Sequence, residues 1–307
     1  MGLTSDGKVT EQTDKPLLKM SKMEKTIIKF CLLLMAVTAF SCQNMVRPDF
    51  DYVSDDDPSL NAPLQRLFAF EGSPVDSILG LRGTATGVSY IDGVSGKAYK
   101  GSPTGQIVYN TAGKLATMDS FTFAFWMKLD ERNGGAQTVF VLPRTDDFWG
   151  NTFMLIDGAA VNDSMLVKFN FAGNWIEFNG NGTKTNGLNR WPDAYGKWKH
   201  VAFTYDATTS TFATYLDGNK LPLDASVTDR FKPKKNPDDP NEIPEPLGAL
   251  KFTNASKFIL GGFQQQAGIY GAPANWMIHY LGALDQFRVY TTALSESEIK
   301  DLYNKKM

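Results

Sequence analysis

The chain has 307 residues, of which 12% are aromatic and 21% charged, and 21 of them are phenylalanine. This length accommodates one large β domain or two ordinary domains, and the aromatic content is sufficient for a sizeable core. The formal net charge of -2 provides no strongly basic surface, so nucleic acids and acidic lipid headgroups are not expected partners.

The N-terminal segment resembles the signal peptide of a bacterial lipoprotein. Lys25–Lys29 form a basic flank, and the apolar run at 30–40 is too short to span a bilayer. The A-F-S-C that follows is similar to a lipobox, which implies that Cys42 is lipidated and anchors the protein at the outer membrane or cell surface of a Gram-negative bacterium. Residues 1–42 are therefore interpreted as a signal segment. An ordinary secretory signal with a spare cysteine is the alternative.

Residues 1–19 are polar and atypical of a signal, which is consistent with a translation start at Met20 or Met23 and a mis-assigned upstream start. Both cysteines lie within the first 42 residues, so no disulfide is expected in the mature body. Residues 43–63 are acidic, contain three prolines and show no sustained period. Such a segment cannot bury enough apolar surface to order itself, and we predict a disordered tether.

From Leu64 onward the sequence has the pattern of short β-strands. Between 121 and 129, Phe or another apolar residue occupies every second position, which is the period of a half-buried strand. Further strands are predicted at Thr138–Leu142, Thr152–Ile156, Met165–Phe171, Trp175–Phe178, Trp198–Tyr205, Thr211–Leu216 and Lys257–Leu260. Asn-Gly or Asp-Gly pairs, which favour tight hairpin turns, occur at 133–134, 157–158, 179–180, 186–187 and 217–218.

This pattern predicts an all-β fold, an antiparallel two-sheet jelly-roll sandwich, with residues 64–307 as one domain. Two segments depart from it. Residues 224–250 contain five prolines and many charges, which predicts a long loop between strands. Ser295 and Glu298 have the spacing of a capping box, which predicts a short C-terminal helix that buries Ile299.

Several blocks of this chain, in order, resemble the laminin G-like jelly rolls of the concanavalin A-like lectin/glucanase superfamily. They are L-F-A-F-E-G at 67–72, G-V-S-G-K-A-Y at 93–99, F-T-F-A-F-W-M-K at 121–128, G-K-W-K-H-V-A-F-T-Y-D at 196–206, Y-L-D-G at 215–218 and G-A-L-D-Q-F-R-V-Y at 282–290. The resemblance covers nearly all of the predicted mature chain and implies a concanavalin A-like sandwich. It does not specify a ligand, because this fold carries lectins, glycosidases and adhesion modules.

The sequence does not provide the motifs expected of a glycosidase or hydrolase. Glycoside hydrolysis usually needs two carboxylates across a cleft, and the E-x-D-x-x-E run of the superfamily's glucanases is missing. Glu242 and Glu245 fall in the predicted loop, and the G-x-S-x-G and zinc motifs are also missing. With His200 and His279 as the only histidines, we expect a protein that is not an enzyme.

An acid interrupts the apolar face of the last predicted strand. Alternation over 279–289 predicts that Asp285 shares one face with Phe287 and Val289. A buried carboxylate without a partner costs several kcal/mol, so Asp285 is expected to be hydrogen-bonded or metal-bound. The resemblance implies a structural calcium ion between the first and last strands, with Asp285, Glu71 and Asp76 as ligands. The alternative is that Asp285 only accepts backbone N–H bonds.

Carbohydrate sites combine exposed aromatic rings with amide and carboxylate groups, and four tryptophans of this chain have such neighbours. The predicted ligand-binding residues are Trp149, Asn151, Trp175, Glu177, Trp191 and Trp276. Trp126 and Trp198 lie inside predicted strands and are expected to be structural. We therefore predict a carbohydrate-binding module of a lipid-anchored surface protein that captures an oligo- or polysaccharide. A protein-binding adhesion or scaffold module, acting through residues 224–250, is the alternative, and a glycoside hydrolase is the third reading.

Overall fold

The computed structural model describes residues 62–306, apart from 132–133, 162 and 183–185. The predicted signal segment, Cys42 and nearly all of the predicted tether lie outside the described residues. Across the part of the chain that is described, no helix is long and apolar enough to cross a membrane.

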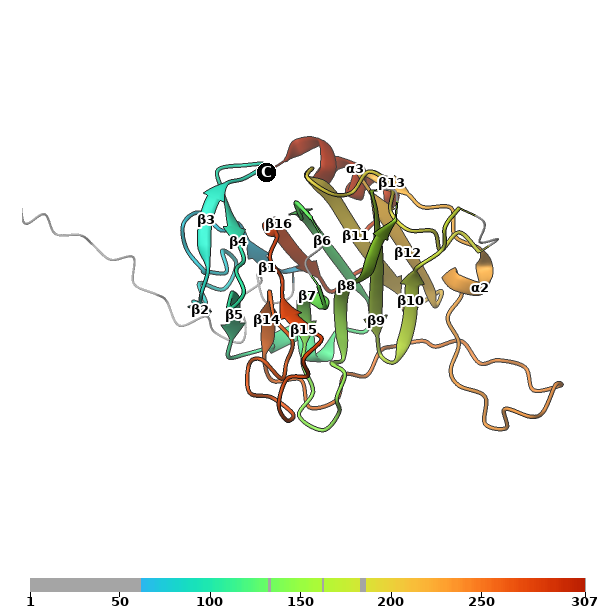
Figure 1. Cartoon of the computed structure of the whole chain (residues 1–307). Helices are drawn as coiled ribbons and strands as arrows, with labels where there is room; N and C mark the ends of the chain where they lie inside the picture. Colours follow the sequence, from blue (N-terminus) through green and yellow to red (C-terminus); the bar gives the residue numbers. More distant parts are fainter. Residues whose placement is uncertain (1–61, 132–133, 162, 183–185, 307) are drawn as a thin grey trace, which may run out of the picture. The chain divides into compact units, whose positions relative to one another are not determined.

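Two antiparallel sheets form a sandwich (Figure 1). The first sheet has the strand order β13-β12-β11-β6-β16-β4-β3, and β1 also pairs with β16. Its strands are β1 (Leu64–Phe68), β3 (Ser89–Asp92), β4 (Lys97–Lys100), β6 (Phe121–Lys128), β11 (Lys199–Asp206), β12 (Thr211–Leu216), β13 (Asn219–Lys220) and β16 (Ala283–Tyr290). The predicted fold class is thus confirmed.

The second sheet has the order β10-β9-β8-β7-β14-β5-β2, with β15 added parallel to β7. Its strands are β2 (Thr84–Thr86), β5 (Gln106–Tyr109), β7 (Ala136–Leu142), β8 (Thr152–Val161), β9 (Ser164–Phe171), β10 (Asn174–Phe178), β14 (Phe258–Leu260) and β15 (Met277–His279). The helical segments are η2 (Gly113–Thr117), α2 (Ala225–Thr228) and α3 (Glu296–Lys305).

Phenylalanines from the inner faces of both sheets form the core between them. Phe123 of β6 stacks on Phe140 of β7 with ring centroids 4.7 Å apart, and Phe169 of β9 lies 4.1 Å from Phe203 of β11. These side chains are fully buried, as the alternation in the sequence predicts. Aromatic pairs of this kind contribute about 0.5–1.5 kcal/mol each beyond the area that they bury.

The outer face of the first sheet is covered by the C-terminal helix α3. Ser295 caps this helix, its side chain accepting from the Glu298 backbone N–H while Glu298 accepts from the Ser295 backbone, so the predicted capping box is confirmed. Ile299 is completely buried against alanines of the sheet, and Tyr303 stacks on Trp126 with ring centroids 5.5 Å apart. Trp126 is thereby structural, as expected.

One predicted turn is instead a bulge inside a strand. The Asp157-Gly158 pair was expected to end a hairpin strand, but β8 continues to Val161 and its register with β9 shifts after Asp157. Gly158 has a φ of 65°, which a glycine adopts without strain. The bulge keeps Asp157 on the sheet rather than in a loop.

The proline-rich segment 224–250 is a long loop, as predicted, and Figure 1 shows it extending away from the strands. It holds its own shape through local contacts. Phe231 forms a bridge with Pro246, and both the Lys235 and Asn236 backbone N–H groups donate to Glu242 at 2.7 and 2.8 Å. Ile243 is the most exposed large apolar side chain of the loop, at 86%.

Candidate functional site

Three tryptophans that are distant in the sequence converge on the outer face of the second sheet. The Trp149 ring lies 5.0 Å from that of Trp175 at 88° and 6.0 Å from that of Trp276 at 39°, measured between centroids. Trp149 is half-buried between the other two, whereas Trp175 and Trp276 are 38% and 41% exposed. The cluster therefore presents two partly exposed rings, each of which contacts the less exposed ring of Trp149.

Buried glutamines fix the loop that carries Trp149. Gln264 donates to the carbonyls of Asp147 and Phe148 at 2.6 and 3.0 Å and accepts from the Arg144 backbone N–H at 2.8 Å. Gln265 adds a bond to the Phe148 carbonyl at 2.7 Å. Because these side chains satisfy otherwise unpaired backbone groups, the loop between β7 and β8 is held in one conformation before any ligand binds.

Strand register places Trp175 and Glu177 beside this loop. They are two residues apart on β10 and so point to the same face of the sheet. Trp175 pairs across with Asn170, and Glu177 pairs with Lys168, on β9. Phe153 on β8 continues the row, and its ring lies 5.2 Å from that of Trp175.

The three tryptophans border a groove of about 550 Å³. It is lined by Gly135, Ala136, Trp149, Leu155, Asp157, Lys168, Trp175, Glu177 and Trp276. Inside it Lys168 Nζ forms an ion pair with Asp157 Oδ2 at 3.0 Å. The arrangement provides apolar ring faces, two carboxylates that accept hydrogen bonds and one ammonium that donates them.

Four of the six predicted ligand-binding residues meet in this groove, and the other two predictions are wrong. Asn151 is buried and structural, because its side chain donates to the carbonyls of Pro143 and Thr253 and accepts from the Thr253 backbone N–H. Trp191 is only 1% exposed, with its ring 5.5 Å from that of Phe178 in the core. Its polar neighbours in sequence gave no sign of the bridge with Met165 that turns it inward.

Asp157 and Lys168 are groove residues that the sequence reasoning missed. Lys168 alternates with buried residues of β9, a pattern that marks it as facing outward. The Asp-Gly pair predicts a turn at Asp157, so the sequence does not indicate that Asp157 lies on the sheet. Only the bulge in β8 and the pairing of three strands reveal that these charges lie beside Trp175.

Asp285 lies on the opposite face of β16 from the predicted one. A bulge at Gln286, whose φ is 48°, shifts the register between Asp285 and Arg288. Leu284 and Phe287 therefore point into the core, whereas Asp285 pairs with Trp126 on the outer face. The prediction that Asp285 shares a face with Phe287 and Val289 was wrong because alternation does not continue through a bulge.

The Asp285 carboxylate holds the loop between β3 and β4. Its Oδ2 accepts the backbone N–H groups of Val94 and Ser95 at 2.7 and 3.0 Å, and a Cβ at Gly93 would collide with it. Its Oδ1 is buried without a hydrogen-bond partner among the described residues. Burial raises the pKa of Asp285 to about 6, and the nearby Glu71 carboxylate contributes to the rise.

The two other predicted calcium ligands differ in their surroundings. Glu71, which follows β1 in sequence, contacts the end of the same loop, because its Oε2 accepts the Lys97 backbone N–H at 2.9 Å. Asp76 is buried and forms an ion pair with Arg66 at 3.4 Å, and it also accepts the backbone N–H groups of Leu67 and Ile78. Both Asp76 oxygens thus have partners within the protein, one of them already a cation, and this disfavours Asp76 as a calcium ligand.

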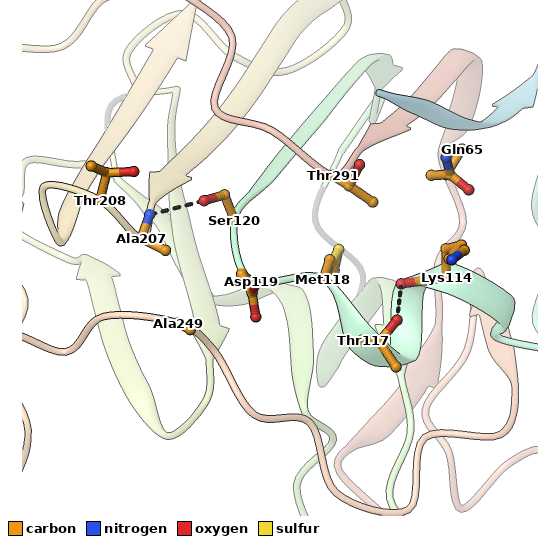
Figure 2. A pocket seen from close by; sticks show the side chains of 10 residues that line it. All are labelled: Gln65, Lys114, Thr117, Met118, Asp119, Ser120, Ala207, Thr208, Ala249 and Thr291. Atoms are coloured by element: carbon orange, nitrogen blue, oxygen red, sulfur yellow. Dashed lines mark hydrogen bonds between the residues drawn. The ribbon is translucent and has the colours of Figure 1, made fainter. Parts of the chain in front are cut away.

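A second hollow, of about 590 Å³, opens where β6 begins. Figure 2 shows its polar side chains, with Ser120 accepting from the Ala207 backbone N–H and Thr117 donating to the Lys114 carbonyl. Its lining residues include no aromatic ring. The hollow therefore offers no stacking surface, in contrast to the tryptophan groove.

Comparison with known proteins supports the architecture. Residues 100–244 match the family model Laminin_G_3, described as the concanavalin A-like lectin/glucanases superfamily. No curated protein sequence matches the chain. Domain 4 of AbnA, a GH43 extracellular arabinanase from Geobacillus stearothermophilus, solved in complex with arabinotriose, is 19% identical with a TM-score of 0.51. The match covers 79% of this chain and 98% of that one.

Two further structures share the fold at lower identity. The binding domain of botulinum neurotoxin DC, solved with rat synaptotagmin II, is 11% identical with a TM-score of 0.50, covering 80% of this chain and 52% of that one. Trypanosoma rangeli sialidase is 15% identical with a TM-score of 0.50, covering 78% of this chain and 32% of that one. This chain thus spans about half and one third of their lengths. Over residues 100–244 this chain is thus similar to the concanavalin A-like lectin/glucanases superfamily, and it shares the fold of these structures.

Proposed function

We propose that this protein binds a glycan in the tryptophan groove and does not cleave it. The observation that supports this function is the pair of exposed rings, Trp175 and Trp276, on either side of Trp149. The C–H faces of sugar rings pack on such aromatic surfaces, while the carboxylates and the ammonium of the groove bind hydroxyl groups. Ligand sites typically combine apolar walls with a few fixed polar groups in this way.

Binding without hydrolysis is favoured by the contacts that Asp157 makes in the groove. A glycosidase needs one carboxyl group protonated as a general acid and a second one ionised. Asp157 pairs with Lys168 through Oδ2 and accepts the Gly158 backbone N–H through Oδ1 at 2.7 Å, so both of its oxygens are engaged within the protein. Asp157 is therefore poorly suited to donate a proton to a leaving group.

The binding experiment compares groove variants by intrinsic tryptophan fluorescence and calorimetry. Arabinotriose is the first probe, because the similar AbnA domain was solved with it, followed by a broad glycan array. Trp175→Ala and Trp276→Ala should each weaken binding at least tenfold while the fold is kept, since both side chains lie at the surface, 38% and 41% exposed, and outside the core between the sheets. Phe231→Ala, an exposed ring on the 224–250 loop, is the matched control and should bind normally.

Two results would contradict this function. Equal affinity of the wild-type protein and both tryptophan variants for the glycan would show that the glycan does not bind in the groove. Release of reducing sugar from a polysaccharide, abolished by Glu177→Gln, would show that the protein is a glycosidase instead.

A protein-binding adhesion module is the second candidate, and the exposed Ile243 on the 224–250 loop favours it. An apolar side chain with 86% exposure on a loop held by its own hydrogen bonds is a suitable anchor for a protein partner. Ile243→Asp would then abolish adhesion to cells, whereas the tryptophan variants would not.

We also propose that Cys42 is lipidated and places the domain at the cell surface. The motif in the sequence supports this, and the predicted acidic tether would give the domain reach from the membrane. Radiolabelled palmitate should be incorporated into the wild-type protein and not into Cys42→Ser. Equal labelling of both would contradict the proposed anchor.

The calcium ion that the family resemblance implies would be held by Asp285 and Glu71, and not by Asp76. Asp285 Oδ1 offers an unpartnered buried oxygen. No group of three His, Cys, Asp or Glu side chains that could hold a metal is present in the described segments, so backbone carbonyls and water would complete the coordination. The ion would neutralise two neighbouring carboxylates and so stabilise the β3–β4 loop.

A further inference from the structure

The formal charges of the ionisable groups that line the tryptophan groove do not sum to zero. Three such groups line it, Asp157, Lys168 and Glu177, and the only cation of these is Lys168. Lys168 Nζ is 3.0 Å from Asp157 Oδ2, so these two charges largely cancel. One negative charge, that of Glu177, is left over.

Glu177 has no ion-pair partner among the described residues. Its Oε2 receives only a long hydrogen bond, 3.4 Å, from the neutral amide of Asn179. Lys168 lies opposite Glu177 in the strand register, but its ammonium is bound to Asp157 on the other side. Glu177 therefore faces the groove as a carboxylate whose charge is not neutralised.

This charge sits next to a ring on which a sugar would stack. Glu177 and Trp175 are two residues apart on β10 and point to the same side. A sugar lying on Trp175 would bring its ring substituents within reach of Glu177. Hydroxyl groups would donate hydrogen bonds to the carboxylate, whereas a uronate, sulfate or sialate group would meet a like charge and an acceptor without a donor.

We propose that Glu177 makes this groove bind uncharged sugars in preference to acidic ones. This inference rests on the proposed function of the groove as a glycan site and adds the class of glycan. A like charge about 6 Å away in a mostly aqueous setting weakens binding roughly three- to tenfold per acidic group. A polymer that carries several acidic groups across the groove would lose more.

The test uses matched polysaccharides that differ only in charge. Mixed-linkage β-glucan, galactomannan and starch-type α-glucan are each offered as the neutral polymer and after oxidation of their primary alcohols to carboxylates. Polygalacturonate and arabinan complete the panel. Affinities of the purified protein are measured by calorimetry between about 0.01 M and 1 M salt, over which the Debye length falls from roughly 30 to 3 Å.

The inference predicts that a bound neutral polymer loses at least threefold in affinity on oxidation at low salt, and that the loss shrinks as salt rises. Glu177→Gln keeps the side-chain shape and should reduce the loss. Lys168→Gln removes the only cation and should increase it. Glu296→Gln, at the start of α3 and exposed, is the control. It should change neither the loss of affinity on oxidation nor the dependence of that loss on salt.

Three outcomes would overturn the inference. Equal or tighter binding of oxidised polymers or polygalacturonate would overturn the selectivity while the glycan-binding function stands. An unchanged loss in Glu177→Gln would overturn the role of Glu177. Absence of binding to every polymer and to arabinotriose would refute the proposed function itself, and this inference with it.

Discussion

Replacement of Asp285 by asparagine should change how the stability of the protein depends on pH. Asparagine keeps an oxygen that can accept the Val94 and Ser95 backbone N–H groups. It removes the charge whose burial, together with the nearby Glu71 carboxylate, raises the pKa of Asp285 from its ordinary 3.8 to about 6. The variant therefore isolates the cost of ionising this carboxyl group inside the fold.

The magnitude follows from linkage between proton binding and folding. A pKa raised on folding means that the folded state holds the proton while the unfolded state has released it. The stability contributed by the protonated group is complete below about pH 4 and is lost as the pH rises through about 6. A change of roughly two pKa units corresponds to about 3 kcal/mol, so Asp285→Asn should gain up to that amount relative to wild type between pH 4 and 7.

Urea denaturation at a series of pH values, in the presence of a chelator, measures this difference. Asp92→Asn is the control, because its exposed carboxylate is hydrogen-bonded to Lys97, which lowers the pKa of Asp92, so any slope should have the opposite sign. A stability difference between wild type and Asp285→Asn that stays constant from pH 4 to 7 would refute this reasoning. Added calcium should stabilise the wild-type protein and not Asp285→Asn if the predicted ion binds there.

Three further changes test the site and the core. Trp191→Ala should lower the free energy of unfolding by about 3–5 kcal/mol, because the side chain is 1% exposed, and a loss below 1 kcal/mol in urea denaturation would contradict its burial. Gln264→Ala removes three hydrogen bonds to the loop of Trp149 and leaves that of Gln265, so calorimetry should show weaker glycan binding together with about 1–3 kcal/mol lower stability. Deletion of residues 233–244 should leave glycan affinity unchanged, whereas lost affinity would place that loop in the site.

The limits of prediction from sequence are clearest where alternation is interrupted. Phe121, Phe123 and Phe125 alternate through an uninterrupted strand, and all three are in the core. Alternation misplaced Asp285 because a bulge at Gln286 shifts the register, and the Asp-Gly turn signal misplaced Asp157 because β8 continues through a bulge at Gly158. A bulge inserts one extra residue into a strand, here Gln286 with a φ of 48°, and a glutamine gives no local indication of it in the sequence.

The tryptophans also show which features the sequence predicts and which depend on the fold. Asn, Gly or charged neighbours predicted exposure for all four, and this holds for Trp175 and Trp276 but not for Trp191. Polar neighbours in the sequence favour exposure of a segment, but they do not specify which side chains pack against it in the folded protein. Trp191 becomes buried because a bridge to Met165 turns it towards Phe178 and Phe203.

Local sequence patterns were sufficient to predict the two-sheet fold, the capped C-terminal helix and the aromatic residues available for a ligand. These depend on the strand period, on capping chemistry and on composition, all of which act over a few residues. The tertiary structure decided that Trp149, Trp175 and Trp276 meet, and that Lys168 neutralises Asp157 and leaves Glu177 charged. Those contacts join residues up to 127 positions apart, from Trp149 to Trp276, and only the pairing and packing of strands brings them together.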